Sequence, residues 1–492
     1  MGKILRKLLG FILGVVVLAV VFAVAVLAWG HHYRSNYTYD APSHIERGED
    51  AKTIIAEGRG LYDENGDLFQ IRGVNYGNLF VVEGWLSPYS MGAKLNEDNS
   101  YFKQNKEGVV EEYEEIYQED MDALLVKRGF TDEQLEALND AFYNSFCTEY
   151  DFENIASMGL NTIRLPISYR SFLTTHDRYR LSDKELCAKN FEDIVFDFEK
   201  LDLFLERAQA NDLRVIIDMH AVMGGQNGYE HCGTRDIDFW DTPEYIEFMC
   251  KLWATIANRY RVGGVRGDLA STVLAYDLAN EPTNRNDIGT SPKKWAVMDI
   301  MYDAIRSVDT DHVISIEGVW FFCSVPNPDR FGWENVLYQY HFYNWQSSWF
   351  PNWAFYDSMY AMLSFSDYDV PKFIGEFNLF NDKQAWMDTL NMYDDHGMGW
   401  TIWNYKAVSV GWWDNSWGVM VYKMWLTPDK ETGEERLKLD LNTATYDEIL
   451  ELWSGLQTDD GTNDGQYKVH EDDSITWHVL KEFFQQEKFQ NK

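Results

Sequence analysis

The sequence predicts an α/β fold, a (β/α)8 barrel with insertions, preceded by one membrane-spanning helix. Short apolar runs alternate with amphipathic helical patterns along most of the chain, which is typical of a parallel sheet whose strands are buried on both faces. A length of 492 residues suits one such barrel carrying long insertions. A single long apolar run, near the amino end, predicts the additional helix.

That apolar run covers residues 8–29, about 22 residues, which is enough to cross the hydrocarbon core of a bilayer. Lys3, Arg6 and Lys7 precede it and predict that the amino end lies in the cytoplasm. We therefore expect residues 1–30 to be a cytoplasmic stub and an uncleaved anchor in the cell membrane, with the rest of the chain outside. The alternative is secretion after cleavage of a signal peptide, because small residues occur within the run.

After the anchor, residues 31–53 are polar and are predicted to be a tether, and residues 54–492 are predicted to form the barrel. Insertions at about 83–150 and 421–473 follow the first and last strands, so both are expected to wall a cleft at the carboxyl ends of the strands. The apolar runs predicted as strands are 68–75, 160–166, 213–220, 272–281, 312–317, 336–341, 372–376 and 399–404. The helical patterns include 191–210, 245–260, 295–308, 384–394 and 474–489.

Composition excludes several kinds of partner. With 43 basic and 79 acidic residues the net charge is −36, which disfavours nucleic acid and polyanionic sugars and favours a neutral substrate. None of the five cysteines forms a Cys-x-x-Cys pair, so no zinc site is expected. We also find no glycine loop of the kind that holds phosphates.

Two glutamates end apolar runs. Glu281 closes run 272–281 and is followed by Pro282, and Glu376 closes run 372–376. Chemistry in (β/α)8 barrels occurs at the carboxyl ends of strands, and two carboxyl groups there can carry out glycoside hydrolysis. Partial burial is expected to raise the pKa of Glu281, as a proton donor requires. The alternative is that Glu281 is a loop glutamate paired with a nearby cation.

Further polar and aromatic residues fall at the other predicted strand ends. Taken singly, Arg164 could be a structural ion pair, His220 a buried histidine with its hydrogen bonds satisfied, and Trp403 part of the core. Their joint occurrence in this order along the chain favours a single site. The full set at strand ends is Arg164, His220, Asn280, Glu281, His341, Tyr343, Glu376 and Trp403.

In this ordered set the sequence resembles glycoside hydrolase family 5, the cellulase family. The motifs that carry the resemblance are residues 161–166, 216–220, 280–282, 341–343, 374–377 and 400–403. Residues 72–78, 83–88 and 218–228 are most similar to the branch of exo-β-1,3-glucanases, although Gly84 stands where that branch usually has proline. The resemblance implies a (β/α)8 barrel, retention of anomeric configuration, and no metal or organic cofactor.

The resemblance also implies roles for individual residues. Glu376 would be the nucleophile, ionised beside Arg164 and held by Tyr343, and Glu281 would be the acid/base oriented by His341. Asn280 would bind the sugar 2-hydroxyl, and Trp403 would form the floor of the subsite. Other sugar hydroxyls would be bound by His220, Glu83 and Asn227.

We therefore expect a retaining β-glycosidase that hydrolyses a neutral β-glucan or β-glucoside, with exo-β-1,3-glucanase-like action. Alternatives within this class are an endo-β-1,4-glucanase, a mannanase, or a β-glycosidase of glycolipid headgroups brought close by the anchor. An alternative of another class is an inactive carbohydrate-binding protein at the cell surface, which would need one glutamate to be lost.

Overall fold

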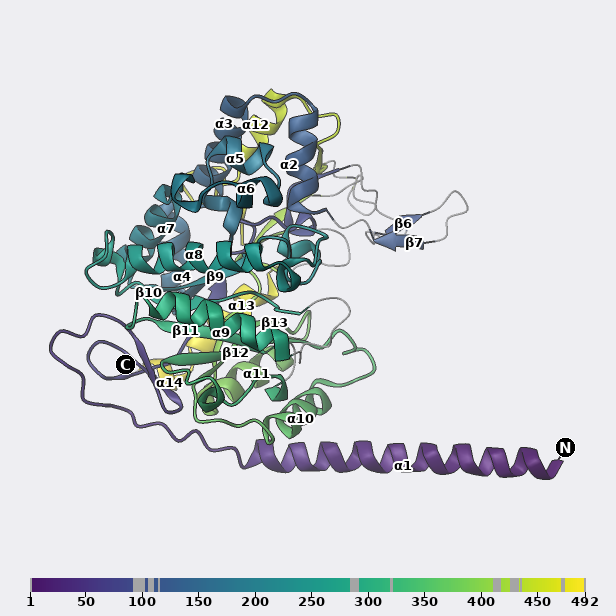
Figure 1. The fold of residues 1–492 in the computed structure, drawn as a ribbon. Coiled ribbons are helices and arrows are strands. Elements are labelled where there is room, and N and C mark those ends of the chain that lie inside the picture. The colour runs from purple at the N-terminus through teal and green to yellow at the C-terminus, as the bar shows by residue number, and fades with distance from the viewer. Residues whose placement is uncertain are drawn as a thin grey trace.

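The predicted barrel is confirmed. The computed structural model describes residues 2–91, 102–104, 110–113, 116–283, 292–318, 322–409, 417–424, 433, 436–469 and 474–490. Eight parallel strands close in the order β4-β8-β9-β10-β11-β12-β13-β14, with β14 paired to β4. Figure 1 shows β9 to β13 of this barrel among the surrounding helices. The strands are β4 (Arg72–Asn75), β8 (Thr162–Ser168), β9 (Arg214–Ala221), β10 (Val273–Asp277), β11 (Val313–Gly318), β12 (Val336–Tyr343), β13 (Lys372–Asn378) and β14 (Gly399–Ile402).

A small antiparallel sheet precedes the barrel. It consists of β1 (Ile55–Glu57), β2 (Gly60–Tyr62) and β3 (Leu68–Phe69). Ile54 and Leu61 from this segment form one apolar cluster with Ile216 and Leu274, which lie near the starts of their barrel strands. The sheet therefore contributes to the core at the amino ends of the strands, and the carboxyl ends remain available for a site.

Six of the predicted strands agree with the structure to within two residues at each end, and two differ by more. Run 68–75 is divided, because residues 68–69 pair within the small sheet and only residues 72–75 enter the barrel. Run 272–281 pairs only as far as Asp277, and its last residues leave the sheet as a loop. Glu281 therefore lies beyond the strand, with a positive φ of 39° that non-glycine residues rarely adopt.

The predicted helices are present, with two divided. Pattern 191–210 contains a 3-10 turn and then α7 (Glu199–Ala210), and pattern 474–489 contains α13 (Ile475–Phe484) and α14 (Glu487–Gln490). The Ser474 side chain accepts from the Trp477 N–H, which caps the start of α13. The other helices around the barrel include α4 (Glu149–Ser157), α5 (Thr175–Arg180), α6 (Asp183–Ala188), α8 (Pro243–Tyr260), α9 (Pro292–Arg306), α10 (Asn352–Leu363) and α11 (Lys383–Asp395).

The described parts of the two predicted insertions pack on each other. The Arg128 guanidinium donates to the Leu441 carbonyl oxygen at 2.6 Å, and the Phe142 and Trp453 rings meet at 5.5 Å. The first insertion is only partly helical, because it also contains β5 to β7. The elements of the first insertion are β5 (Tyr89–Ser90), β6 (Phe102–Gln104), β7 (Val110–Tyr113), α2 (Gln118–Lys127) and α3 (Asp132–Phe146). The elements of the second insertion are β16 (Met420–Lys423), β17 (Leu439–Asp440) and α12 (Tyr446–Ser454). Strand β17 pairs with β5, which joins the two insertions. Residues 92–101, 105–109, 114–115, 425–432, 434–435 and 470–473 of these insertions lie outside the described residues.

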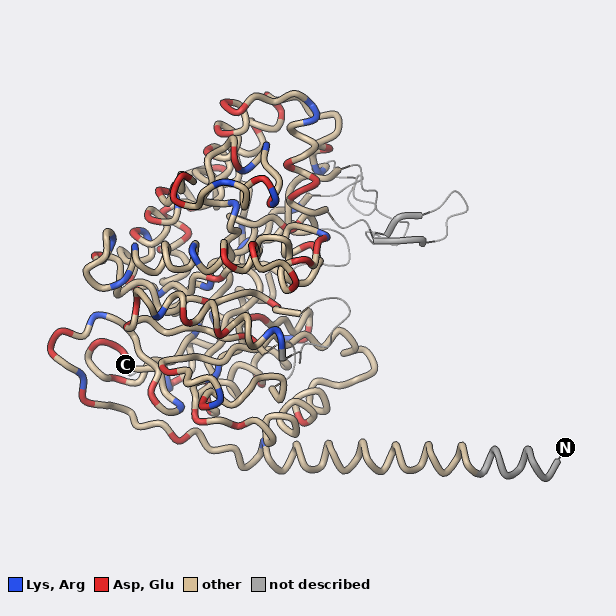
Figure 2. The backbone as a smooth tube through the Cα atoms, in the orientation of Figure 1, with Lys and Arg blue, Asp and Glu red and all other residues tan. Residues whose placement is uncertain are grey.

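The amino-terminal run forms one long helix, α1 (Gly2–Ser35). Its segment Phe11–Ser35 is long and apolar enough to cross a membrane. Figure 2 shows charged residues spread over the body and none along the apolar part of α1 between Phe11 and Gly30. The helix continues through residues 31–35, so the predicted tether begins five residues later than expected.

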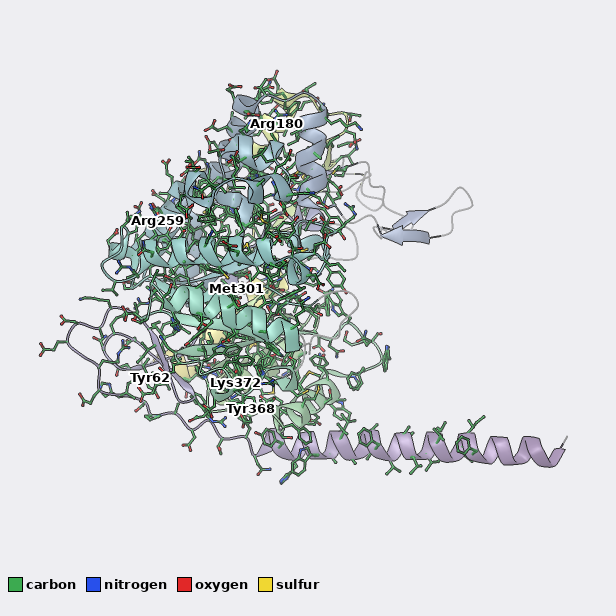
Figure 3. The ribbon with its side chains drawn as sticks, viewed as in Figure 1. Tyr62, Arg180, Arg259, Met301, Tyr368 and Lys372 are labelled. Atoms are coloured by element: carbon green, nitrogen blue, oxygen red, sulfur yellow. The ribbon has the colours of Figure 1, made fainter. Side chains whose placement is uncertain are left out.

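The carboxyl end of α1 is joined to the barrel by a polar network. Asp367 accepts a hydrogen bond from the Tyr33 hydroxyl and another, 2.9 Å long, from the Arg59 guanidinium. The Lys372 ammonium lies 3.0 Å from Asp367 and donates to the Tyr368 carbonyl oxygen at 2.9 Å. Figure 3 shows Lys372 and Tyr368 close together above the carboxyl end of α1. Because Lys372 begins β13, this network ties α1 to a barrel strand.

Candidate active site

The two predicted glutamates meet at the carboxyl ends of the strands. Glu281 follows β10 and Glu376 lies near the end of β13, and both side chains are buried. His341 Nδ1 is 3.1 Å from Glu281 Oε1 and 3.6 Å from Glu376 Oε2. These two carboxylate oxygens therefore lie at most 6.7 Å apart, the sum of the two distances.

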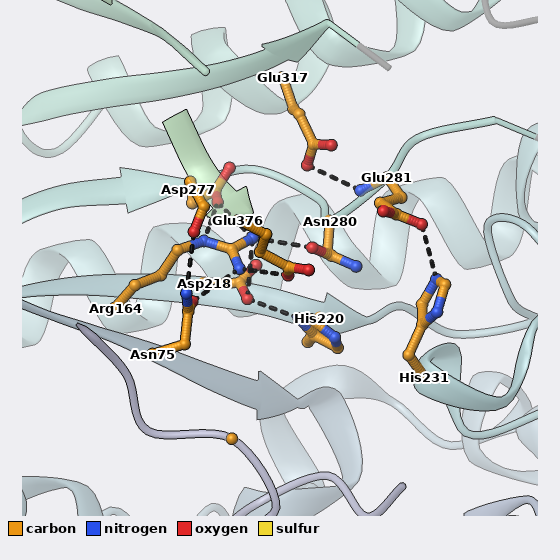
Figure 4. Close-up of polar contacts among 12 residues, drawn as sticks. Asn75, Arg164, Asp218, His220, His231, Asp277, Asn280, Glu281, Glu317 and Glu376 are labelled. Atoms are coloured by element: carbon orange, nitrogen blue, oxygen red, sulfur yellow. Dashed lines mark hydrogen bonds and ion pairs between the residues drawn. The ribbon is translucent and has the colours of Figure 1, made fainter. Parts of the chain in front are cut away.

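Arg164 of β8 connects the site to the barrel interior (Figure 4). Its Nη1 donates to Glu376 Oε1 at 2.9 Å, and its Nε and Nη2 donate to Asp277 Oδ2 at 3.1 and 3.0 Å. Asp218 lies 3.1 Å from Nη2, and the Asn280 amide oxygen accepts from the same nitrogen at 2.8 Å. Burial by itself lowers the pKa of Arg164, but the surrounding carboxylates raise it above its ordinary value.

Asp218 and Asp277 are buried acids on neighbouring strands. Burial raises the pKa of each to about 7, although the charge of Arg164 acts in the opposite direction. His220 Nδ1 lies 2.7 Å from Asp218 Oδ2, so the aspartate fixes the orientation of the ring. One guanidinium thus faces three carboxyl groups, and protonation of these aspartates would relieve the excess of negative charge.

Glu376 is held by hydrogen bonds at both carboxylate oxygens. Arg164 occupies Oε1, and the Tyr343 hydroxyl at the end of β12 donates to Oε2 at 2.9 Å. Burial raises the pKa of Glu376 above its ordinary value, while His341, Arg164 and the Tyr343 hydrogen bond lower it. Arg164 therefore favours the ionised form as predicted, without fully outweighing the effect of burial.

The carboxyl group of Glu281 lies between two histidines. Oε1 faces His341 Nδ1 at 3.1 Å, and Oε2 faces His231 Nε2 at 3.2 Å. The Gln339 amide nitrogen lies 3.2 Å from His341 Nε2, and an NH₂ group can only donate, so that nitrogen accepts. His341 therefore carries its proton on Nδ1, from which it donates to Glu281.

The ionisation of Glu281 depends on these histidines. Burial by itself raises its pKa, but the charge of His231, the hydrogen bond and charge of His341 and the charge of His220 together outweigh burial and lower the pKa to about 2. Burial, however, lowers the pKa of both His220 and His341, so these rings are neutral near pH 7. At neutral pH the charges of these two rings are therefore absent, while the hydrogen bond from His341 Nδ1 still lowers the pKa of Glu281.

The hydrogen bonds of Asn227 indicate the protonation state of His231. Its Oδ1 accepts from the Tyr229 N–H at 2.9 Å, so its Nδ2 is the atom that lies 2.8 Å from His231 Nε2. Because the amide nitrogen only donates, His231 Nε2 accepts and is not protonated. Its contact with Glu281 Oε2 is then favourable when the carboxyl oxygen carries the proton. With the histidines charged the pKa of Glu281 is lowered, contrary to the prediction from the sequence; with them neutral, only the His341 hydrogen bond opposes the rise that burial causes.

The remaining predicted residues surround this centre. The Trp403 ring stacks on His220, with centroids 5.6 Å apart and planes at 14°. Glu83 accepts from Trp85 Nε1 at 2.8 Å, and burial, followed by the charges of Glu230 and Glu376, raises its pKa well above the ordinary value. The Asn227 amide bonds protein groups, including the Glu281 carbonyl oxygen at 3.2 Å, and this contact positions the loop that carries Glu281.

The family model for "Cellulase (glycosyl hydrolase family 5)" matches residues 126–409, more than half of the chain. The chain belongs to glycosyl hydrolase family 5. This confirms the resemblance inferred from the strand-end motifs, and the matched region contains all the residues described above except Glu83 and Trp85.

Curated relatives of this family 5 chain carry glucan glucosidase and xylosidase names. It is 28% identical to "Glucan 1,3-beta-glucosidase 2" of Candida albicans over 44% of this chain and 40% of that protein. It is 30% identical to "Glucan 1,3-beta-glucosidase 2" of Wickerhamomyces anomalus over 47% of each chain. It is 28% identical to "Beta-xylosidase" of Phanerodontia chrysosporium over 43% of this chain and 40% of that protein. The chain thus spans less than half the length of these relatives.

One group of potential metal ligands lies within the family 5 site. Glu281, Glu317 and His341 each place one ligand atom within 4.8 Å of the others. Hydrogen bonds among the protein groups account for this arrangement, since His341 donates to Glu281 and Glu317 accepts the Glu281 N–H at 2.7 Å. We therefore assign no metal to these residues.

Sequence reasoning missed the roles of four acidic or basic residues in this family 5 site. Asp218, Asp277 and Glu317 each interrupt an otherwise apolar strand, and a buried acid in such a run is a signal that could have identified them. His231 lies in the loop after β9, with no strand pattern around it. Only the folded loop shows that it contacts Glu281 (Figure 4).

Proposed function

We propose that this chain is a retaining β-glycosidase that hydrolyses β-glucosidic bonds of a neutral glucan by double displacement. The observation that carries the proposal is the pair of facing carboxyl groups at one mouth of the barrel. Glu281 Oε1 and Glu376 Oε2 are at most 6.7 Å apart. Retaining enzymes place the two groups about 5–5.5 Å apart and inverting enzymes about 6.5–9.5 Å, so this upper limit excludes most of the inverting range and supports retention.

In the first step, Glu376 attacks the anomeric carbon while the bond to the leaving oxygen breaks and Glu281 gives that oxygen its proton. Arg164 and Tyr343 hold the attacking carboxylate in one orientation through hydrogen bonds of 2.9 Å each. Before the reaction the proton on Glu281 Oε2 is held by His231 Nε2, which accepts it in a hydrogen bond. The product of this step is a glycosyl ester of Glu376 and a free leaving group.

In the second step, ionised Glu281 takes a proton from water, which attacks the anomeric carbon and releases Glu376. Two inversions give net retention. The Asn280 amide oxygen accepts from Arg164, which orients its amide nitrogen to donate to the sugar 2-hydroxyl. That contact strengthens as positive charge develops on the sugar ring. Trp403, His220 and Glu83 would contact the reacting sugar.

The names of the curated glucanase relatives favour a β-1,3-linked glucan. Exo action is supported by the contact between the two insertions, since the Lys438 ammonium donates to the Gly84 and Trp85 carbonyl oxygens at 3.2 and 3.3 Å. This contact lies next to Glu83 and would close one side of the cleft. An endo-β-1,4-glucanase or a mannanase is the second candidate, and would require an open trough.

We further propose that α1 is retained as a single-pass anchor, with residues 54–492 as the catalytic domain outside the cell. The support is the packing of the carboxyl end of α1 on α10, where Trp29 Nε1 donates to Ser364 Oγ at 2.9 Å and Arg34 Nε donates to Asp357 at 2.8 Å. A signal peptide that is removed makes no such contacts in the mature protein.

The test is hydrolysis of laminarin, carboxymethylcellulose and mannan by the purified full chain, with the anomeric configuration of the first product followed by NMR. We expect β-glucose from laminarin. Glu376→Gln should lose roughly 10⁴-fold or more in kcat with folding intact, because the nucleophile is removed. The matched control is Glu334→Gln at an exposed position. Near-normal activity of Glu376→Gln, or an inverted product, contradicts the proposal.

A further inference from the structure

The loop between β12 and α10, together with the first turn of α10, carries an unusual set of exposed tryptophans. Trp345, Trp349 and Trp353 are 54%, 74% and 59% exposed. In the part of the chain that the structure describes, the only other exposed tryptophan is Trp29, near the end of the apolar span of α1. Tryptophan is enriched where proteins cross the membrane–water interface, because its ring is apolar and its N–H is polar.

This loop is part of the rim of the active-site mouth. Because it follows β12, it leaves the barrel at the carboxyl ends of the strands. The Trp345 ring stacks on Tyr343 with centroids 5.3 Å apart and planes at 26°, and the Tyr343 hydroxyl bonds Glu376. Only two side chains therefore separate the proposed nucleophile from the exposed segment.

The contacts of α1 fix the direction in which this rim faces. Beyond the hydrogen bonds of Trp29 and Arg34, α1 meets α10 at Gly30, where an added Cβ would lie 1.7 Å from the Asp357 carbonyl oxygen. Only glycine permits so close an approach. From α10, the apolar part of α1 extends to the same side of the molecule as the β12–α10 loop (Figure 1). A bilayer crossed by α1 therefore faces the rim.

A groove connects the rim with the end of α1. It has a volume of about 830 Å³ and lies between α1, the β12–α10 loop and the β13–α11 loop. Apolar side chains contribute to its walls, and Phe380 also packs on Trp345 and Trp417 at the mouth. Its lining includes Arg34, Trp353, Tyr356, Leu379, Phe380 and Met392. Polar side chains, including Asn381, Asp382 and Gln384, form the rest of the lining, so the groove offers one apolar wall along the path from the mouth toward the bilayer.

We propose that Trp349 and Trp353 dock in the outer interface of the bilayer that α1 crosses, so that the mouth faces lipid. The substrates that this placement favours are β-glucosides whose apolar aglycone stays in the bilayer. This inference rests on the retained anchor and the glycosidase activity proposed above. A mouth that faces lipid admits a lipid-linked sugar directly, whereas a polymer must enter between the rim and the membrane.

The position of the rim is tested on the full chain in liposomes. The variant Trp349→Cys is made together with Cys323→Ser, which removes the exposed native cysteine. The cysteine at position 349 is labelled with an environment-sensitive fluorophore, and the lipids carry a nitroxide near the headgroup. The matched control is Val265→Cys, 76% exposed in the connection between α8 and β10 at the opposite end of the barrel. The Cys323→Ser parent gives the background from the remaining cysteines.

We expect the nitroxide lipid to quench the label at position 349 and to leave the label at position 265 unchanged. Equal responses at the two positions would overturn the inference. Gly30→Val, which forces α1 away from α10, should reduce quenching at position 349 while the protein stays in the membrane. Unchanged quenching would show that the contact of α1 with α10 does not set the orientation of the barrel relative to the bilayer.

The substrate class is tested with two substrates, a long-alkyl β-glucoside held in liposomes and soluble laminarin. The double variant Trp349→Ser/Trp353→Ser should lose at least about tenfold in rate on the liposomal substrate and little on laminarin. Val265→Ser should change neither rate. Equal loss on both substrates, or no loss on either, contradicts the lipid-facing mouth. If the unaltered chain hydrolyses neither substrate, the proposed glycosidase activity fails instead.

Discussion

The Glu281 backbone N–H donates a 2.7 Å hydrogen bond to the Glu317 carboxyl group. This bond runs from the loop after β10 to the neighbouring strand β11. It holds Glu281 at a positive φ of 39°, a conformation that costs free energy for a residue with a Cβ and that clusters at functional sites. Glu317 is therefore a positioning residue, which keeps the proposed acid/base turned toward His341 and His231.

Glu317→Gln should retain most activity, whereas Glu317→Leu should lose it. Burial, followed by the charges of Asp277 and Glu281, raises the pKa of Glu317 well above its ordinary value, so a neutral amide resembles the form present. Leucine leaves the Glu281 N–H unpaired, which costs about 1–3 kcal/mol. Steady-state kcat and thermal unfolding of both variants provide the measurement. Equal kcat in the two variants would rule out the positioning role.

Glu281→Ala should lose glycosidase activity on substrates with poor leaving groups and keep part of it on activated aryl glucosides. Such leaving groups need no proton, so the first step survives, and the second step becomes slow because no base activates water. Added azide should then restore turnover and give a β-glycosyl azide, which chromatography detects. A variant with neither residual activity nor azide rescue would argue for another acid/base.

Replacement of Arg164 should shift the acid limb of the pH profile of kcat/KM. Arg164 lowers the pKa of Glu376, so removal of its charge raises that pKa, and the limb moves to higher pH by about 1–3 units for Arg164→Met. Arg164→Lys keeps the charge and should shift it less. Removal of one partner of a buried ion pair also costs roughly 3–5 kcal/mol, so the lysine variant is the safer protein to measure. An unshifted limb in both variants would mean that Arg164 does not act through Glu376.

Asp218→Asn should flatten the dependence of stability on pH. Burial raises the pKa of Asp218 from 3.8 to about 7, so the folded state holds a proton that the unfolded state has released. This contribution to stability is complete below about pH 3.8 and is lost as the pH rises through about 7. The Tm of the native chain should therefore fall more steeply between pH 4 and 7 than that of the variant.

The control for this measurement is Asp303→Asn on the exposed face of α9, which should leave the slope unchanged. Comparison of variant with native chain at fixed high ionic strength removes the contributions of the other titrating groups and of the net charge. Identical slopes for Asp218→Asn and the native chain would mean that Asp218 is ionised in the folded state.

The sequence by itself determined the barrel, its eight strands and the strand-end glutamates. A strand buried on both faces must be apolar, so its length and the polar residue that ends it are visible along the chain. The same local patterns predicted the apolar helix α1 and placed Arg164, His341, Tyr343 and Trp403 at one mouth. These features depend on neighbouring residues alone.

Only the tertiary structure decided which charged side chains contact one another. Closure of the barrel brings Asp218, Asp277 and Glu376 around Arg164, and the loop after β9 brings His231 to Glu281. The contact of Gly30 with α10, which sets the direction of the mouth relative to the anchor, likewise joins residues more than three hundred positions apart. Sequence patterns indicate which residues are buried. The pKa values of the site and the orientation of its mouth depend instead on distances between residues remote in sequence, and those distances are set only when the chain folds.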